Sequence, residues 1–261
     1  DALSGELTKS MEVQARNTNG GVLNEENGLS TLRLADFDGD GIADYAYAGD
    51  LQGNLWRFDL LGAGASPDNA TANPPSNVYG AKNGNTGKFK VSYDGKAMFT
   101  ARADYNGSPA QPSTSAPSLV RHPTRLGYLV VFGTGRYVEI GDKEPNKSYA
   151  QSLYGVWDTK TKAETTGAPP SISRSNMTQQ SFNSSDTTGK GETTNIVRQA
   201  RILSNNPVEW YTDYNSTKPI KKRGWYVDFD GGGKQGEIMV EDMRTLGNTL
   251  FLQTLVPNDD P

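Results

Sequence analysis

The stretch from Thr31 to Leu60 reads TLRLADFDGDGIADYAYAGDLQGNLWRFDL, and it decides the class of fold. Apolar and polar side chains alternate in Thr31–Leu34, in Tyr45–Ala48 and in Asn54–Leu60. This period of two residues is typical of half-buried β-strands. An Asp/Gly-rich loop separates the first two segments, and the turn Asp50–Gly53 separates the second from the third. The stretch therefore predicts consecutive strands joined by short connections.

The same pattern continues through the rest of the chain, where sustained helical periodicity is nearly absent. The further candidate strands are Gly127–Phe132 (an apolar run expected to be buried on both faces), Leu153–Trp157, Gly224–Phe229, Glu237–Val240 and Leu250–Leu255. The chain has 29 glycines and 14 prolines in 261 residues, which predicts many turns between short elements. We therefore predict an all-β fold, and the pattern alone leaves a sandwich, a barrel and a propeller open.

A weak internal repeat is compatible with the propeller and does not decide among these folds. Tyr154–Asp158 and Trp56–Asp59 both end an aromatic strand on an aspartate. Propeller blades are repeats of strands punctuated in such a way.

Three segments contain few core-forming residues, namely 62–88, 106–118 and 160–195. Chains of this composition cannot bury enough surface to offset the entropy of ordering them. We expect them to be long surface loops inserted into a single domain that spans residues 1–261. Insertions between strands are favoured over dedicated adhesive loops.

Composition excludes several chemistries. The chain has no cysteine, which excludes disulfides, thiolate metal sites and cysteine nucleophiles. Its one histidine, His122, has no nucleophile motif nearby, so we expect it to be hydrogen-bonded or solvated rather than catalytic. A formal net charge of −4 gives no general attraction to nucleic acid. No apolar run approaches the roughly 20 residues of a membrane-spanning helix, so no transmembrane segment is expected.

The strongest chemical motif is DFDGDGIAD, which starts at Asp36. The alternating carboxylates of Asp36, Asp38 and Asp40 can turn inward in a curling loop, and the glycine at the sixth position permits the sharp turn. The backbone carbonyl of Ile42 and the carboxylate of Asp44 can complete a shell of hard oxygen ligands. Such a shell suits Ca²⁺ better than Mg²⁺, which retains more of its water.

An empty Asp/Gly turn is the alternative interpretation of this motif. Four carboxylates so close together repel one another unless a cation neutralises them, which favours the metal site. The loop is not an EF-hand, because Tyr47 stands where the bidentate glutamate is required and strands flank the loop. We expect calcium to hold the two strands of the hairpin Leu32–Tyr47 together, so that its binding stabilises the fold.

The segment Ala35–Leu60 resembles the calcium-loop region of the PilC/PilY family, the adhesins at the tip of type IV pili. The similarity extends to four further segments: Val130–Asp142 (VVFGTGRYVEIGD), Gln151–Asp158 (QSLYGVWD), Arg223–Phe229 (RGWYVDF) and Leu250–Pro257 (LFLQTLVP). It therefore spans most of the chain outside the three loop segments.

The resemblance implies part or most of a modified β-propeller from the family's C-terminal domain. It also implies calcium at Asp36, Asp38, Asp40, Ile42 and Asp44. In the family, calcium occupancy regulates pilus extension and retraction, and the proteins support pilus assembly, twitching motility and adhesion. By resemblance, the chain is not an enzyme. The implied partners are minor pilins of the pilus tip complex and a host-cell or surface receptor. The implied location is the bacterial cell surface at the pilus tip, with passage through the periplasm or outer membrane during assembly.

Two other classes of function remain open. The segment GNLWRFDL, from Gly53 to Leu60, is similar to the tryptophan-docking repeats of quinoprotein dehydrogenases, but we find no set of base and quinone-binding residues. An integrin-type calcium propeller would serve as a generic ligand-binding scaffold. That class carries several loops like Asp36–Asp44, whereas this sequence has one.

Overall fold

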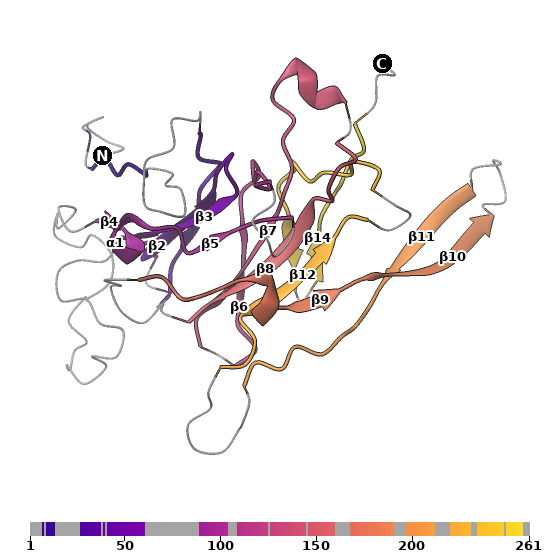
Figure 1. The fold of residues 1–261 in the computed structure, drawn as a ribbon. Helices are drawn as coiled ribbons and strands as arrows, with labels where there is room; N and C mark the ends of the chain where they lie inside the picture. The colour runs from indigo at the N-terminus through magenta and orange to yellow at the C-terminus, as the bar shows by residue number, and fades with distance from the viewer. Residues whose placement is uncertain are drawn as a thin grey trace.

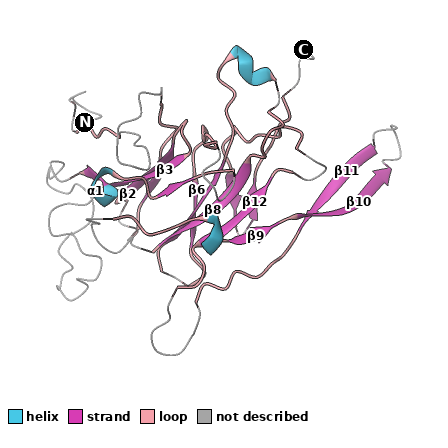
Figure 2. Ribbon diagram, viewed as in Figure 1, coloured by secondary structure: helices cyan, strands magenta, loops and turns pink. Residues whose placement is uncertain are grey.

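The computed structural model describes residues 7, 9–13, 27–37, 39, 41–60, 89–103, 109–124, 126–144, 146–159, 168–190, 197–211, 220–230, 234–247 and 249–257. Strands dominate these residues, and helices are few and short (Figures 1 and 2). The all-β prediction is confirmed.

The first sheet has five strands in the order β1-β2-β3-β4, with β5 also paired to β3. These strands are β1 (Arg33–Ala35), β2 (Tyr45–Gly49), β3 (Asn54–Asp59), β4 (Lys90–Val91) and β5 (Phe99–Thr100). All of their pairings are antiparallel. The register pairs Ala35 with Tyr45, so the acidic loop closes the hairpin between β1 and β2.

The second sheet also has five strands, in the order β6-β7-β8-β12-β9. Its strands are β6 (Ser118–Arg121), β7 (Tyr128–Gly133), β8 (Ser152–Asp158), β12 (Gly224–Asp228) and β9 (Thr178–Gln180). The edge strand β9 pairs with β12 in parallel, and the other pairings are antiparallel. Within the described residues neither sheet closes on itself, which argues against a barrel.

Two hairpins and three short helices complete the described structure. The hairpins are β10 (Phe182–Lys190) with β11 (Val197–Leu203), and β13 (Arg244–Leu246) with β14 (Thr249–Phe251). The helices are α1 (Ser92–Gly95), η2 (Ile140–Lys143) and η3 (Arg174–Asn176). The β10–β11 ribbon projects away from the body of the molecule (Figure 1).

The two sheets pack against each other through a shared core rich in aromatic rings. Phe99 of the first sheet lies 6.1 Å from the ring of Phe132 and 5.2 Å from the ring of Tyr154, both in the second sheet. All three rings are buried. Aromatic pairs at such distances add packing energy beyond the area that they bury.

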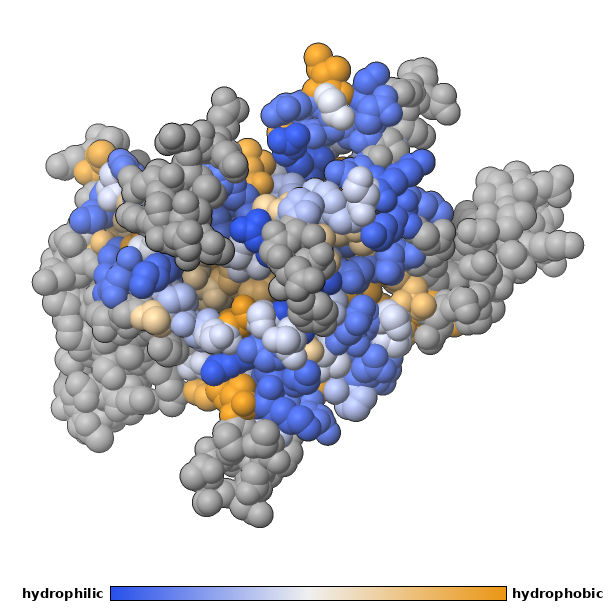
Figure 3. All heavy atoms as spheres, in the orientation of Figure 1, coloured by the Kyte–Doolittle hydropathy of each residue, from blue (hydrophilic) through white to orange (hydrophobic). Residues whose placement is uncertain are grey.

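Strand β7 is buried on both faces, as its apolar sequence predicted. Tyr128, Val130 and Phe132 face the core between the sheets, whereas Leu129 and Val131 face a second cluster behind the sheet. The first sheet is layered in the same way, because Trp56 and Phe58 of β3 belong to a third cluster on its outer side. On the face shown in Figure 3, the coloured residues are largely hydrophilic, with apolar residues in scattered places.

The other strand predictions are confirmed with small shifts of their bounds, with two exceptions. Glu237–Val240 forms no strand, because only Ile238 makes a bridge, which pairs it with Leu255. The segment Leu250–Leu255 is a strand only as far as Phe251.

The three predicted loop segments have different outcomes. Residues 62–88 lie outside the described part of the chain. The described part of 106–118 is not an exposed loop, because most of residues 111–118 are buried between the sheets. Segment 160–195 also differs from the prediction, since η3, β9 and β10 form within it. Ser113 bridges Gly135, β9 pairs with β12, and β10 pairs with the next strand, β11, so backbone pairing orders stretches whose own composition is polar.

Candidate metal centre

The acidic loop joins two strands that pair directly beneath it. The amide of Asp44 donates to the carbonyl of Ala35 at 2.8 Å, and the amide of Leu60 donates to the carbonyl of Asp44 at 2.8 Å. Asp44 is therefore fixed by the backbone of both neighbouring strands. The loop begins and ends on a rigid part of the first sheet.

The Asp36 carboxylate is oriented by the loop's own backbone. Its Oδ1 accepts the amide of Gly39 at 2.7 Å, and its Oδ2 accepts the amide of Gly41 at 2.7 Å. Gly39 and Gly41 have φ of +80° and +86°, values that residues with a side chain rarely adopt. The two glycines let the chain curl around Asp36. A carboxylate oxygen has two lone pairs, so in general it can accept an amide and also bind a cation.

Asp44 lies at the base of the loop with no solvent exposure. Its Oδ2 accepts the amide of Phe37 at 2.6 Å, so the carboxylate points back toward the start of the loop. Carboxylate ligands of metal ions are commonly held by such additional hydrogen bonds. A charge buried to this extent is costly unless it is compensated, and a bound cation would supply that compensation.

The second sheet touches the loop from the side. The hydroxyl of Tyr128, at the start of β7, donates to the carbonyl of Asp36 at 3.0 Å. The Phe37 ring meets the Tyr128 ring edge-on with centroids 5.8 Å apart, and Arg121 donates to the carbonyl of Phe37 at 3.4 Å. These side chains line a cavity of about 240 Å³ beside the loop, together with Gly127. Burial raises the pKa of the Tyr128 hydroxyl, and the nearby carboxylates of Asp44 and Asp36 reinforce that rise against the opposing effect of Arg121.

Asp36 begins the loop and Asp44 ends it. The carboxylate of Asp44 bonds the amide of Phe37, the residue next to Asp36. Ile42 lies in the same loop and is half-buried. Asp38 and Asp40 fall outside the described ranges, within which no group of three acidic or histidine side chains forms a metal site. The two aspartates that are described supply carboxylate oxygens, the donor type that hard divalent cations prefer. The contacts with Tyr128 and Arg121 had no signal in the sequence, because these residues lie far along the chain.

His122 is hydrogen-bonded, one of the two non-catalytic alternatives expected for it. Its Nδ1 lies 2.7 Å from the hydroxyl of Thr124, and its ring stacks on Trp157 at 3.9 Å. The side chain is 2% exposed. Gly133 ends β7, and Gly135 forms a bridge to Ser113. This short glycine-containing segment is therefore a strand end followed by a turn.

The fold and loop define a β-propeller-type module with an acidic loop between two strands of one sheet. The family model for the PilY1 beta-propeller domain matches residues 1–193, and the chain belongs to this family. Type IV pilus biogenesis factor PilY1 from Pseudomonas aeruginosa strain UCBPP-PA14 is 44% identical over the whole chain. A PilY1 homolog from Xylella fastidiosa is 30% identical over 88% of the chain.

A solved structure agrees with these sequence relatives. The crystal structure of the Pseudomonas aeruginosa PilY1 C-terminal domain superposes with a TM-score of 0.79 and 42% identity, covering 97% of this chain and 49% of that one. The predicted propeller class and the resemblance to the PilC/PilY family are confirmed. The chain spans 22% of the length of the UCBPP-PA14 protein and 13% of the Xylella homolog. No helix in the described ranges is long and apolar enough to cross a membrane.

Proposed function

We propose that this chain is a non-enzymatic, calcium-binding module of a type IV pilus biogenesis and tip adhesin protein. Calcium would bind at Asp36, Asp38, Asp40, Ile42 and Asp44. Its occupancy would regulate pilus extension and retraction, and with them twitching motility and adhesion to surfaces or host cells. The association with the pilus rests on the relatives, which are named as type IV pilus biogenesis factors.

The observation that carries the proposal is the orientation of the Asp36 carboxylate. Both of its oxygens accept backbone amides of glycines in the same loop, so the group is held at the loop's centre. The motif adds further carboxylates at Asp38, Asp40 and Asp44. Mutual repulsion among them disfavours the empty loop, and a divalent cation removes that repulsion.

The contact with Tyr128 suggests how occupancy would reach beyond the loop. Calcium would fix Asp36, whose carbonyl accepts the hydroxyl of Tyr128 on the second sheet. A loop ordered by the ion would therefore also order the side of the molecule where the two sheets meet. In the assembled protein we infer that this surface contacts minor pilins or the tip complex at the cell surface.

Thermal unfolding of the 261-residue chain with and without calcium tests the site. Calcium at about 100 times its Kd should stabilise the chain by about 2.7 kcal/mol, because it binds the folded form alone. Asp40→Asn and Asp44→Asn should reduce the calcium-dependent rise in Tm. Asp94→Asn is the matched control, since Asp94 is an exposed carboxylate in α1. An equal rise in all four proteins, or none in the unmodified chain, would contradict the calcium site.

The regulatory part needs a separate test in cells. Asp44→Asn in the full-length parent protein should impair piliation and twitching, whereas Asp94→Asn should leave both unchanged. Normal twitching with a site that no longer binds calcium would refute regulation and leave the binding site itself standing.

A further inference from the structure

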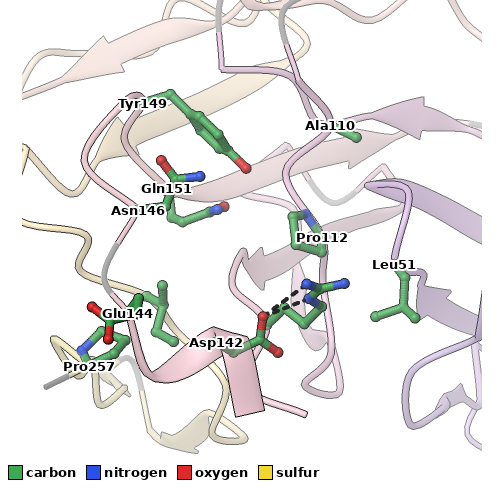
Figure 4. A pocket seen from close by; sticks show the side chains of 12 residues that line it. Leu51, Ala110, Pro112, Asp142, Glu144, Asn146, Tyr149, Gln151 and Pro257 are labelled. Carbon is green, nitrogen blue, oxygen red and sulfur yellow. Dashed lines mark hydrogen bonds and ion pairs between the residues drawn. The ribbon is translucent and has the colours of Figure 1, made fainter. Parts of the chain in front are cut away.

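A polar pocket that shares no residue with the acidic loop lies between the β2–β3 turn and the connection from β7 to β8 (Figure 4). Its volume is about 400 Å³. Leu51 and Pro112 line one side, and Glu144, Asn146 and Pro257 line the opposite side. Nothing in the proposed calcium function uses this pocket.

The pocket contains a buried acceptor that has no partner. Gln151 is 6% exposed, and its Oε1 makes no hydrogen bond within the described structure. The side chain of Tyr149 lies beside Gln151, and its hydroxyl points into the pocket in Figure 4. Burial raises the pKa of the Tyr149 hydroxyl, so it is neutral at pH 7. A buried carbonyl oxygen without a donor is costly, and a ligand N–H at this point would satisfy it.

The charges at the rim favour a cation over an anion. Arg136 donates from Nε to Asp142 Oδ1 at 3.0 Å, and its Nη1 lies 3.6 Å from a carboxylate oxygen of Glu139. The guanidinium is therefore already matched by carboxylates. Glu144 is exposed, lines the pocket and has no ion pair among the described side chains. The charge left over at the rim is negative.

Part of the wall is apolar and is held in place by backbone hydrogen bonds. Ile238 pairs with Leu255 through two bonds, of 2.8 and 2.9 Å, and Gly135 donates to the carbonyl of Pro112 at 2.6 Å. Ala110 and Leu51 extend the apolar wall. Such a pocket is formed before any ligand arrives, which lowers the entropic cost of binding.

We propose that this pocket binds a primary ammonium group at the end of an alkyl stem, in the form of a lysine side chain presented by a protein partner. The stem packs on Leu51, Pro112 and Ile238. The ammonium donates to Gln151 Oε1 and is attracted by Glu144. An ammonium has three N–H donors and no acceptor, which suits a pocket lined by a carbonyl oxygen and a carboxylate.

A protein source of the lysine is favoured by the surface next to the pocket. Tyr137, Val138 and Ile140 lie on the same connection as Arg136 and Glu144, and they are 49%, 64% and 87% exposed. Exposed apolar residues grouped beside a polar pocket are typical of protein-binding sites. A partner that inserts a lysine can cover them, whereas a free amine cannot.

Titration of the ¹⁵N-labelled 261-residue chain, followed by NMR, tests the proposal. The probe is Nα-acetyl-lysine N-methylamide, with a Kd expected near about 1 mM for one anchored side chain. The expected result is a saturable shift of the Gln151 side-chain amide signals. The norleucine analogue, which lacks the ammonium, and acetate should leave these signals unchanged. A saturable response to either of them would overturn the proposal.

Single substitutions test the contributions of Glu144 and Gln151 to binding separately. Glu144→Gln should weaken binding about threefold, as the loss of a partly exposed ion pair does. Gln151→Leu should weaken it about tenfold, because it removes a hydrogen bond to a charged donor. Glu241→Gln removes an exposed carboxylate that does not line the pocket and should have no effect. Unchanged affinity in both pocket variants, with native spectra, would overturn the assignment.

A capped peptide with leucines on both sides of one lysine should bind more tightly than n-pentylamine, because the leucines can cover Tyr137, Val138 and Ile140. Equal affinity of this peptide and n-pentylamine would overturn the protein source of the lysine.

Discussion

Arg57 of β3 and Asp158 at the end of β8 form a fully buried ion pair between the two sheets. Nη1 of Arg57 lies 2.9 Å from Oδ2 and 3.1 Å from Oδ1 of Asp158, and both side chains have 0% exposure. The same guanidinium donates to Asp59 at 2.8 Å and lies 4.5 Å from the centre of the Tyr45 ring. Tyr47 donates its hydroxyl to Asp158 at 2.8 Å. The two sheets therefore share a polar network within an aromatic core.

Replacing Arg57 by methionine should destabilise the chain by about 3–5 kcal/mol, because Asp59 and Asp158 would remain buried without their cation. Urea unfolding at pH 7 measures the loss. Arg136→Met is the matched control, since Arg136 pairs with Asp142 while 39% exposed, and it should cost at most about 1 kcal/mol. Equal losses of unfolding free energy in the two variants would show that the buried ion pair contributes no more to stability than the exposed one.

Asp50 is the second buried carboxylate with a testable structural role. It accepts the indole N–H of Trp56 at 2.7 Å, the amide of Gln52 at 2.9 Å, and both the amide and the side chain of Asn54 at 2.8 and 2.9 Å. Asp50→Asn turns one acceptor into a donor among these donors. We expect a loss of about 2–3 kcal/mol in the free energy of unfolding. Asp94→Asn, on the surface, should change it little, and a similar loss there would contradict the role of Asp50.

His122 should make the protein less stable in acid. Burial lowers its pKa from 6.5 to about 4, and its Nδ1 accepts the amide of Thr124 at 3.2 Å, a hydrogen bond that a second proton on Nδ1 would break. As the pH falls from 6.5 to 4, the unfolded chain takes up a proton at this residue while the folded chain does not. Stability is therefore lost across that window, by about 2–3 kcal/mol between pH 7 and pH 4.5.

The comparison of His122→Phe with the unmodified chain isolates this contribution. Urea unfolding of both proteins at pH 7, 6, 5 and 4.5 gives two curves in which the carboxylates contribute equally. The curve of the variant should be flatter across the window. Parallel curves would mean that His122 is protonated equally in the folded and unfolded states.

Much of the fold could be predicted from local pattern. Strands β2, β3, β7, β8 and β12 carry strong alternation or continuous apolar runs, and all five formed. The faint repeat of aspartates at strand ends also has a physical meaning. Asp59 and Asp158 both accept Arg57, and Asp228, at the end of β12, pairs with Arg174 at 2.8 Å. Each aspartate neutralises a buried arginine.

The buried polar segment at residues 111–118 could not be predicted, because its partners are distant in sequence. Gln111 donates to the carbonyl of Ala150 at 2.8 Å, and Ser113 donates to the carbonyl of Gly133 at 3.0 Å. A side chain on Gly49 would meet Ser113 at 2.6 Å, so the two chains approach as closely as small residues allow. The polar composition of this segment indicated an exposed loop. Its polar groups can nevertheless be buried, because they are hydrogen-bonded to distant parts of the chain.

The candidate metal site was also only partly predictable from the sequence. The aspartates and glycines of the loop are close in sequence, and the sharp turn expected at Gly41 is present, with a φ of +86°. Tyr128 and Arg121 reach the loop from another sheet, and no local pattern marks them. The turn within the loop was therefore predictable, whereas the contacts between the loop and the second sheet were not.

Gly41 should be required for its backbone conformation alone. Its φ is +86°, and a Cβ built on it meets nothing within 4 Å. Gly41→Ala should therefore cost about 1–2 kcal/mol of unfolding free energy in saturating calcium, because alanine resists the left-handed region. Gly41→Asn should cost less, since asparagine tolerates that region better. Gly141→Ala is the matched control, because Gly141 has equal space and no positive φ, and it should be nearly neutral. An asparagine variant as unstable as the alanine variant would show that the side chain, rather than the conformation, is at fault.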